Sequence, residues 1–506
     1  MTTLTIAEPV APPDKGAEPV APAPASASAP ASASASASAP ASRDKGLRTG
    51  ALGLISSVVI AVSSTAPAYS MAATLGLIVA VVGVHSPGTL VVSFLPMLCI
   101  AYAFRELNKA DPDCGTTFTW TARAFGPRAG WMGGWGLIAA DIIVMASLSQ
   151  IAGRYFLQLV GAGSAGAAWV TVVGVAFIAL LTWVCYRGIE VSARLQQVLL
   201  VIEVGALAGH AHPSAGWLNP WTGSFSSLSN SFLLAVFIYW GWDCALSVNE
   251  ETKDSARTPG RAAVMATLML VAIFAVISVA ALAYAGPAFL ASHSTDVLGA
   301  MASSVLGTVP GKLLVLCVLT STAASAQTTI MPTARATLAM AAHGAIPGWF
   351  ARMHPRYRTP TVATLVMGTV SVLFFVLLTA VSRNVLADSA ASVGLLIAFY
   401  YGLTGFACVW FFRRDMLRSA HALLVKGILP LVGGLTLLGA FVLSIKSYWP
   451  AASSYSSFHG IGGIFLIGAG SLLIGVIVML ITSRFLPRYF ADGITVPAQG
   501  ERSMSS

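Results

Sequence analysis

Apolar positions along this chain gather into long runs that are separated by short polar segments. A helix needs about 20 apolar residues to cross the hydrocarbon core of a bilayer, and we predict about twelve such helices on that basis. They lie near residues 51–82, 88–107, 130–160, 167–186, 191–210, 226–248, 262–285, 311–342, 361–381, 386–412, 425–446 and 460–482. The first, third and eighth runs are so long that they require a tilted or broken helix.

The ends of the chain follow a different pattern. Residues 1–48 are rich in Ala, Ser and Pro and offer almost no side chain to bury, which predicts a disordered tail. This tail lacks the apolar core of a signal peptide, so we expect it to be retained. The predicted organisation is this tail, a twelve-helix membrane domain over 49–485, and a C-terminal tail over 486–506.

The first apolar run carries a polar interruption at its centre, the sequence SSTAPAYS at positions 63–70. Unpaired backbone groups are costly in hydrocarbon, so a broken helix persists there only where protein covers the break or where the break lines a cavity. One interpretation is a packed helix kinked at Pro67, with hydroxyls bonded to the preceding turn. The other is a binding site.

The sixth run repeats this interruption, with Gly241 and the acidic Asp243 near its middle. Paired interruptions in two halves of a chain are typical of inverted-repeat transporters, whose sites lie at the breaks. Spans one to five and six to ten then form two repeats, with two helices added. Half-helix N-termini suit a carboxylate and freed carbonyls suit an ammonium, so a solute that carries both groups fits such a site.

Composition and charge agree with a membrane protein. Hydrophobic residues make up 56% of the chain and charged residues 9%, with a mean hydropathy of +0.79, whereas a soluble domain has about 25% charged residues. With both termini inside, only Arg154, Lys312, Arg383 and Lys446 of the 28 basic residues fall outside the predicted cytoplasmic segments. The net charge of +9 is then explained by loops that face anionic lipid, not by nucleic-acid binding.

Other classes of function find little support. The six cysteines have no CxxC spacing, which predicts free thiols, and His210 and His212 are a weak ligand pair, so we expect no metal site and no cofactor. A nucleophile–base pair or an H-E-x-x-H motif would indicate an enzyme, and neither is found. A channel usually repeats one pore element around an axis, whereas this chain has two broken helices, so a channel is disfavoured. A nutrient sensor that binds without transporting stays open, and the oligomeric state is not predicted.

Three segments resemble the amino acid–polyamine–organocation permeases. YAFRELNKADPDCGTTFTWTARAFGPRAGWMGGW (102–135) is similar to that family's loop between helices two and three. GWDCALSVNEETKDSARTPGRA (241–262) is similar to its sixth helix, and ARATLAMAAHGAIPGWFARMHPRYRTPTVA (334–363) to the end of its eighth helix. The resemblance covers about residues 48–485 and says little about which solute is carried.

The resemblance implies an all-α, leucine-transporter-like fold with alternating access, and substrate contacts at the two breaks. Mapped onto this sequence, the contact residues are Ser63, Ser64, Thr65, Ala66, Pro67, Tyr239, Trp240, Gly241, Trp242 and Asp243. The first break lacks the glycines common in the family, so Ser64 and Thr65 hydroxyls replace some bare backbone amides. Asp243 either pairs with a substrate amine or has a structural role.

Buried acids and hydroxyls are the candidates for ion coupling. Carboxylates in mid-membrane usually mark proton or ion pathways, which draws attention to Glu203 on span five and Asp141 on span three. Ser321 and Ser325 share one face of span eight and either ligate sodium or serve as helix-packing contacts. Glu203 is alternatively a structural residue bonded to a neighbouring helix.

Two further groups are expected near the ends of the pathway. Tyr400 and Tyr401 on span ten are candidate gate residues, or ordinary packing residues. At the cytoplasmic mouth, two groups of charged residues either form ion pairs that lock the outward-facing state or are solvated loop charges. The groups are Arg105, Arg123 and Arg128 with Glu106 and Asp111, and Glu250 and Glu251 with Lys253.

Together these features predict a plasma-membrane permease that imports amino acids or related small amines. We expect import to be coupled to protons, with Na⁺ as the alternative coupling ion. The alternatives are a polyamine or amine exchanger of the same fold, or a non-transporting sensor.

Overall fold

The computed structural model describes residues 45–187, 214–221, 225–294, 296–304, 308–382 and 384–494. These residues form a bundle of α-helices with one short β-hairpin. The predicted fifth span and its candidate coupling residue Glu203 lie outside the described residues. The predicted tail boundary at residue 48 differs slightly from the packing, because Lys45 and Leu47 are already buried.

The first half of the bundle contains both interrupted helices. Its α-helices are α1 (Leu54–Thr65), α2 (Pro67–Val82), α3 (Ser86–Ala110), α4 (Thr117–Phe125), α5 (Pro127–Leu159), α6 (Ala167–Arg187), α8 (Phe225–Ile238) and α9 (Cys244–Ser247). The short turns between them are η1 (Gly83–His85), η2 (Ala215–Leu218) and η3 (Asn249–Glu251). The predicted first span is therefore divided into α1 and α2, and the sixth into α8 and α9.

The second half consists of longer helices and the hairpin. Its α-helices are α10 (Thr258–Ser292), α11 (Val297–Ser304), α12 (Thr308–Ala342), α13 (Thr361–Val381), α14 (Val385–Phe411), α15 (Ala420–Leu423), α16 (Leu429–Tyr448), α17 (Gly463–Phe485) and α18 (Pro487–Asp492). The turns are η4 (Gly348–Ala351), η5 (Met416–Arg418) and η7 (Ala451–Ser453), and η6 (Leu424–Ile428) is a π-helix. β1 (Ser457–Phe458) pairs antiparallel with β2 (Ile461–Gly462).

Nine segments among the described residues are long and apolar enough to cross a membrane. The first runs from Leu54 to Ala110 and contains α1, α2 and α3, which the sequence pattern divides into two spans. The predicted sixth span is not among the nine, since its break leaves only short helices. The chain is thus a multi-pass membrane protein, and the count of twelve spans stays a prediction.

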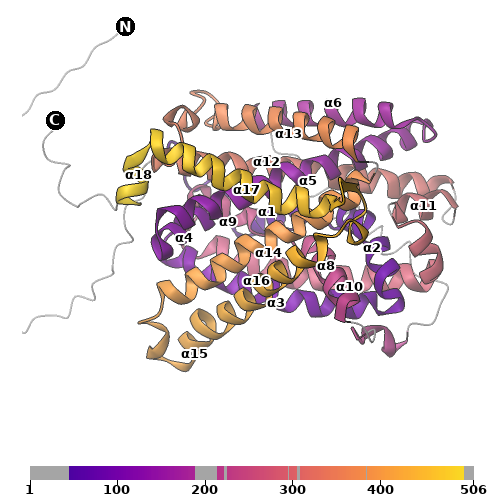
Figure 1. The fold of residues 1–506 in the computed structure, drawn as a ribbon, viewed down its shortest axis with the longest axis horizontal. Helices are drawn as coiled ribbons and strands as arrows, with labels where there is room; N and C mark the ends of the chain where they lie inside the picture. Colours follow the sequence, from indigo (N-terminus) through magenta and orange to yellow (C-terminus); the bar gives the residue numbers. More distant parts are fainter. Residues whose placement is uncertain are drawn as a thin grey trace, which may run out of the picture. The chain divides into compact units, whose positions relative to one another are not determined.

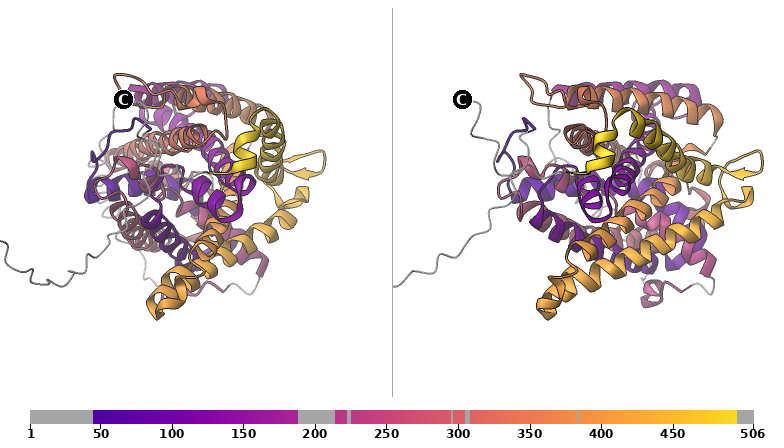
Figure 2. Two further views of the ribbon diagram at one scale, coloured as in Figure 1. Left: turned by 90° about the vertical axis from the view of Figure 1, so that its left-hand side faces the viewer. Right: turned by 60° about the vertical axis from the view of Figure 1, so that its left-hand side comes forward.

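Helix packing places the interrupted helices inside the bundle. The long α14 packs against α5, α8 and α16, while α6 and α13 lie side by side along one edge in every view (Figures 1 and 2). Large apolar side chains such as Leu373, Leu377 and Leu473 are exposed on α13 and α17. A bilayer provides an apolar surrounding for such a surface.

The first interruption is made by a single residue. Ala66 adopts a left-handed conformation (φ 46°, ψ 72°) that ends α1, and Pro67 occupies the first turn of α2. Proline suits that position because its fixed φ fits a helix and its missing N–H would lack a partner there. A left-handed conformation costs a residue with a Cβ about 1–2 kcal/mol, so the surrounding structure must hold this break in place.

Gly241 in the second interruption is expected to tolerate no side chain. Its φ is +115°, and an added Cβ would lie 2.8 Å from the backbone of Ser64 and Thr65. We predict that Gly241→Ala lowers the stability of the purified protein by about 2 kcal/mol or more, since backbone strain adds to a clash with backbone atoms. Thermal unfolding in detergent measures the difference.

The matched control is Gly470→Ala in α17, where an added Cβ meets nothing within 4 Å. That change should be neutral or stabilising by up to about 1 kcal/mol, because alanine favours a helix interior. Equal melting temperatures for the two variants would contradict the close approach of the two breaks.

Candidate functional site

The two interruptions meet in the interior of the bundle. Gly241 lies against the carbonyl carbon of Ser64 and the backbone nitrogen of Thr65, closer than any residue with a side chain allows. Only four residues separate Tyr239 from Cys244, where α9 begins, and α1 contacts α9 directly. The broken segments predicted from two distant parts of the sequence therefore form one region.

Hydroxyl groups of α12 and α2 satisfy much of the first break. Ser325 Oγ donates to the carbonyl of Ser64 (2.9 Å), and Ser70 Oγ donates to the carbonyl of Thr65 (2.7 Å). The backbone N–H of Tyr69 donates to Ser321 Oγ at 3.4 Å. Ser321 and Ser325, the predicted coupling residues, thus lie against the break; whether they bind an ion stays a prediction.

The second break is held by aromatic side chains. The Tyr239 hydroxyl donates to the carbonyl of Leu90 (3.1 Å). Trp240 Nε1 donates to the hydroxyl of Tyr400, which in turn donates to Asp243 Oδ2 at 3.2 Å. One predicted gate residue, Tyr400, therefore bonds directly to the predicted site.

Trp242 and Tyr401 point into a separate aromatic group. Their ring centroids are 5.2 Å apart, and both rings lie about the same distance from Phe104, at 5.2 and 5.3 Å. All three residues are buried. Trp242 therefore contributes packing behind the break in this conformation, whereas Trp240 faces the interior.

A small enclosed cavity of about 10 Å³ lies where the breaks meet, roughly the room that one water needs. The lining residues are Ser64, Leu137, Asp141, Trp240, Gly241, Asp243, Thr328, Thr329 and Pro332. Asp141 and Asp243 come from α5 and the second break, and both are buried. The Thr333 hydroxyl donates to Asp141 Oδ2, so each carboxylate has a hydroxyl partner.

The predicted contact residues divide into two groups. Ser64, Trp240, Gly241, Asp243 and also Asp141 line the cavity. The remaining residues are buried in the structure around it and do not line it: Ser63, Thr65, Ala66, Pro67, Tyr239 and Trp242. The sequence did not single out Thr329 or Pro332, which α12 brings to the cavity.

A larger pocket of about 700 Å³ lies elsewhere, between the C-terminal part of α5 and parts of α6, α10, α11 and α13. Arg154 and Asp296 are among its lining residues, and Asp296 Oδ1 accepts a hydrogen bond from the Tyr155 hydroxyl (2.6 Å). This pocket shares no lining residue with the small cavity. The two breaks and the two buried acids favour the small cavity as the functional site despite its size.

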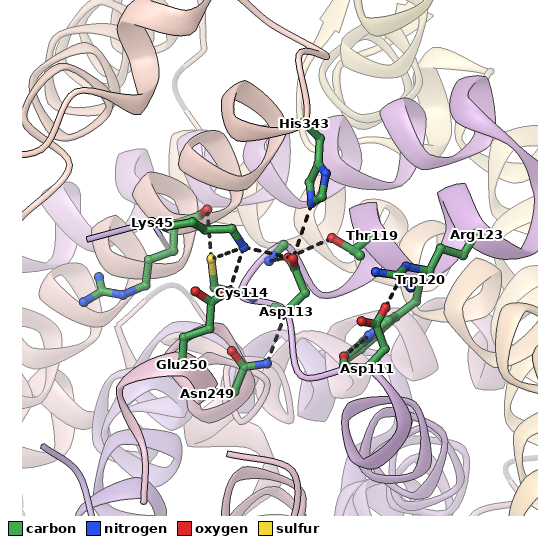
Figure 3. Close-up of polar contacts among 12 residues, drawn as sticks. Lys45, Asp111, Asp113, Cys114, Thr119, Trp120, Arg123, Asn249, Glu250 and His343 are labelled. Carbon is green, nitrogen blue, oxygen red and sulfur yellow. Dashed lines mark hydrogen bonds and ion pairs between the residues drawn. The ribbon is translucent and has the colours of Figure 1, made fainter. Parts of the chain in front are cut away.

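A second buried polar group joins the segment before α1, the loop after α3, η3 and the end of α12, on the side predicted to face the cytoplasm (Figure 3). We call Lys45, Asp113, Cys114, Glu250 and His343 the Lys45 cluster. Lys45 Nζ lies 2.9 Å from Asp113 Oδ2, 2.6 Å from Glu250 Oε1 and 3.4 Å from Cys114 Sγ. His343 Nε2 lies 3.4 Å from the same Asp113 oxygen.

Burial and charge act against each other in this cluster. Burial alone would lower the pKa of Lys45, but the side chains of Cys114, Asp113 and Glu250 raise it well above its usual value. Burial would likewise raise the pKa of Asp113, but Lys45 and His343 hold that pKa well below its usual range. Burial raises the pKa of the Cys114 thiol. The cluster is thus a buried ammonium bound to two carboxylates.

Two further ion pairs lie near the Lys45 cluster. Arg335 of α12 pairs with Glu251 (2.6 Å), and Arg123 pairs with Asp111 (2.9 Å). Burial raises the pKa of Asp111 to about 6, against the opposing effect of Arg123. The predicted role of Lys253 is wrong: its side chain is exposed, and Glu250 and Glu251 pair with Lys45 and Arg335 instead.

The cluster also contains the one group in the described ranges with the donor set of a metal site. The oxygens of Asp113 and Glu250 and the sulfur of Cys114 lie within 4.8 Å of one another. The Lys45 ammonium already lies among these atoms and supplies the positive charge they require. The six cysteines are free, as the sequence predicts, and all six are buried.

Comparison with known proteins adds a family relationship. The amino acid permease family profile matches residues 52–469. An uncharacterized transporter of Mycobacterium tuberculosis is 28% identical, covering 63% of this chain and 72% of its own. The branched-chain amino acid permease BcaP of Bacillus subtilis is 24% identical (71% and 80% covered), and the low-affinity putrescine importer PlaP of Escherichia coli is 22% identical (74% and 84% covered).

The buried ion pairs should dominate stability at this end of the protein. We predict that Asp113→Asn lowers the unfolding free energy by about 3–5 kcal/mol, because Lys45 then loses one of its two buried counter-ions. The pKa of Asp113 is lower in the folded protein than in the unfolded chain. The carboxylate of Asp113 therefore stabilises the folded protein fully above the unfolded pKa of about 3.9, and this stabilisation is lost as the pH falls below that value. Asp113 itself therefore contributes no pH dependence from about pH 5 to 8, and any slope of the difference near pH 6 reflects Asp111, whose pKa Asp113 helps to raise.

Asp415→Asn is the control, since its pair with Arg418 is well exposed (43% and 79% of the two side chains). Exposed pairs contribute about 1 kcal/mol or less. Denaturant unfolding in detergent measures the free energy of unfolding of both variants. If Asp113→Asn and Asp415→Asn lose the same small amount, the Lys45 cluster does not stabilise the protein as a buried ion-pair group.

Proposed function

The chain belongs to the amino acid permease family, and on that premise we propose that it is a secondary active transporter for amino acids or related small amines. It carries the solute across the plasma membrane into the cell by alternating access, in symport with protons. The observation that carries this proposal is the cavity between two interrupted helices, which Asp141 and Asp243 line within a membrane-spanning bundle. Acids at such a depth commonly serve substrate or proton movement.

Substrate binding is proposed to use both breaks. The ammonium group of the solute pairs with Asp243 and with carbonyls freed at the breaks, such as that of Ser64. A carboxylate, where the solute has one, is received by hydroxyls of Ser63, Ser64 and Thr65 and by the N-terminal end of α2. The cavity of about 10 Å³ is too small for an amino acid, so the bundle must widen there when solute enters.

The proposed movement follows the inverted-repeat arrangement. Spans one to five and six to ten form two repeats in a leucine-transporter-like fold of twelve helices, with both termini in the cytoplasm. The broken helices move against the rest of the bundle and open the cavity to each side in turn. Tyr400 and Tyr401 act as a gate on this path; the bond from Tyr400 to Asp243 supports that role for the first of them.

Coupling is proposed to reside in acids near the cavity. Glu203 accepts the transported proton, with Asp141 as the second candidate. Asp141 lines the same cavity as Asp243, which supports a direct link between proton and solute. If the ion is Na⁺ instead, Ser321 and Ser325 are the proposed ligands, since both contact the backbone at the first break.

An amine exchanger is the second candidate, and one observation favours an amine as the solute. Two aspartates line the cavity, and the described lining residues include no Lys or Arg. A solute with more ammonium than carboxylate groups would compensate that negative charge when it replaces water. A diamine or a cationic amino acid would then be carried in exchange for another.

Uptake into proteoliposomes tests the function. A labelled panel of neutral and cationic amino acids, 4-aminobutyrate and putrescine is offered with an inward proton gradient, a sodium gradient or neither. We expect one class of solute to accumulate with the proton gradient only, and a protonophore to abolish the accumulation. The Asp243→Asn protein should lose at least about 90% of uptake, because a neutral amide attracts an ammonium far less than a carboxylate does.

The control variant is Asp415→Asn, an exposed aspartate remote from the cavity, which should transport normally. If diamine loaded inside the proteoliposomes exchanges for external diamine whether or not an ion gradient is present, the result would support the amine exchanger. If the protein binds a solute but moves none under a proton gradient, a sodium gradient or no gradient, the result would contradict transport and favour a nutrient sensor.

A further inference from the structure

The pocket of about 700 Å³ at the C-terminal part of α5 takes no part in the proposed transport path, because it shares no lining residue with the cavity between the breaks. Since α5 begins on the side predicted to face the cytoplasm, this pocket lies toward the predicted outer side. Figure 1 shows α11, which forms part of its wall, and α4 at opposite ends of the bundle. Pockets for small molecules have volumes of about 300–1,000 Å³, so a whole solute fits here.

One face of α5 carries polar side chains into this pocket. Gln150, Arg154 and Gln158 line it at intervals of four residues, a spacing that places side chains on the same face of a helix. Arg154 has neither an ion pair nor a hydrogen bond within the part of the chain that the structure describes. The side-chain oxygen of Gln150 is buried and has no hydrogen-bond partner. One guanidinium and one amide oxygen are therefore free to bind a ligand.

A carboxylate is held in the facing wall. Asp296 directly precedes α11, and its Oδ1 accepts hydrogen bonds from the Tyr155 hydroxyl (2.6 Å) and from the Gly299 N–H (3.1 Å). Gln158 Nε2 donates to the Gly299 carbonyl at 3.4 Å. These bonds attach the start of α11 to α5 and orient the carboxylate. The described lining residues thus include one Arg and one Asp, whose charges are opposite.

The helices around the pocket pack closely against one another. A Cβ added to Gly153 of α5 would lie 2.5 Å from the carbonyl oxygen of Val170 in α6, and one added to Gly174 of α6 would lie 2.6 Å from the ring of Phe375 in α13. Val170 and Phe375 both line the pocket and give it an apolar wall. The space is therefore a shaped pocket between tightly packed helices.

These groups match the two charges of an amino acid. A guanidinium binds a carboxylate through two parallel hydrogen bonds, which gives the pair both strength and orientation. The Gln150 oxygen and the Asp296 carboxylate accept hydrogen bonds from an ammonium group. A zwitterion that replaces water here supplies a partner to both Arg154 and Asp296, whereas an amine or a carboxylic acid alone supplies only one.

We propose that this pocket is a second binding site, which takes the zwitterion of an amino acid and is separate from the cavity between the breaks. Arg154 binds the carboxylate, Gln150 and Asp296 bind the ammonium, and Phe375 and Val170 contact an apolar side chain. Binding at this site does not require transport, so the proposal goes beyond the proposed function and can be tested without it.

A cysteine at Thr171, which lines the pocket, reports occupancy, since the six native cysteines are buried. The rate of its modification by an impermeant maleimide is measured in nanodiscs by peptide mass spectrometry. The probes are L-leucine, L-glutamine and L-lysine, with isoamylamine and isocaproate, which each keep only one of the two charged groups of leucine. We expect at least one amino acid to slow the modification, and neither single-charge compound to do so at the same concentration.

Arg154→Gln in the same protein should raise the amino acid concentration needed for half-protection about tenfold or more, because hydrogen bonds to a charged group are lost. Lys312→Gln is the matched control: it removes an exposed positive charge on the predicted outer side, at a residue that does not line the pocket, and should leave protection unchanged. Asp243→Asn, which impairs the cavity between the breaks, should also leave protection at the Thr171 position intact.

The proposal is overturned if no amino acid slows modification, if isoamylamine or isocaproate protects as well as the amino acid, or if Arg154→Gln and Lys312→Gln behave alike. If Arg154→Gln does not fold, Arg154→Lys keeps the charge but loses the planar pair of donors, and a smaller rise in the half-protection concentration is expected. Loss of protection in Asp243→Asn alone would assign the effect to the cavity and contradict a second site. Uptake is not measured in any of these comparisons, so failure of the second site is distinguishable from failure of transport.

Discussion

Backbone groups at the two helix breaks must find partners inside the protein, because the hydrocarbon around it offers none. At the first break, α12 supplies them: Ser325 donates to the Ser64 carbonyl, and Ser321 accepts from the Tyr69 N–H. At the second break, Gly241 approaches the same backbone so closely that no side chain fits between them. The breaks thus stabilise each other and depend on one neighbouring helix.

This dependence makes α12 the element that connects the regions of the protein. Its Ser321 and Ser325 contact the first break, its Thr333 hydroxyl bonds to Asp141, and its Arg335 pairs with Glu251. Just beyond its end, His343 approaches Asp113 in the Lys45 cluster. Cavity and closed end therefore share one rigid support, and a movement of α1 relative to α12 alters both.

Much of this arrangement could be predicted from the sequence, since long apolar runs and two polar interruptions are strong local signals. A break within residues 63–70 and the burial of Asp141 and Asp243 follow from those signals, whereas its exact position at Ala66 is known only from the structure. The Lys45 cluster could not be predicted, because its residues are scattered over nearly 300 positions and no spacing connects them. Lys253 was the nearer partner in sequence, but folding brings Lys45 and Arg335 to the glutamates instead.

We propose that the cavity between the breaks binds solute and opens to both sides of the membrane. The direct test is a cysteine at Thr328, which lines the cavity, labelled by an impermeant maleimide in right-side-out and in inside-out vesicles. We predict labelling in both preparations, slowed in each by the transported solute. Labelling from one side only, or labelling that no transported solute slows, would contradict it.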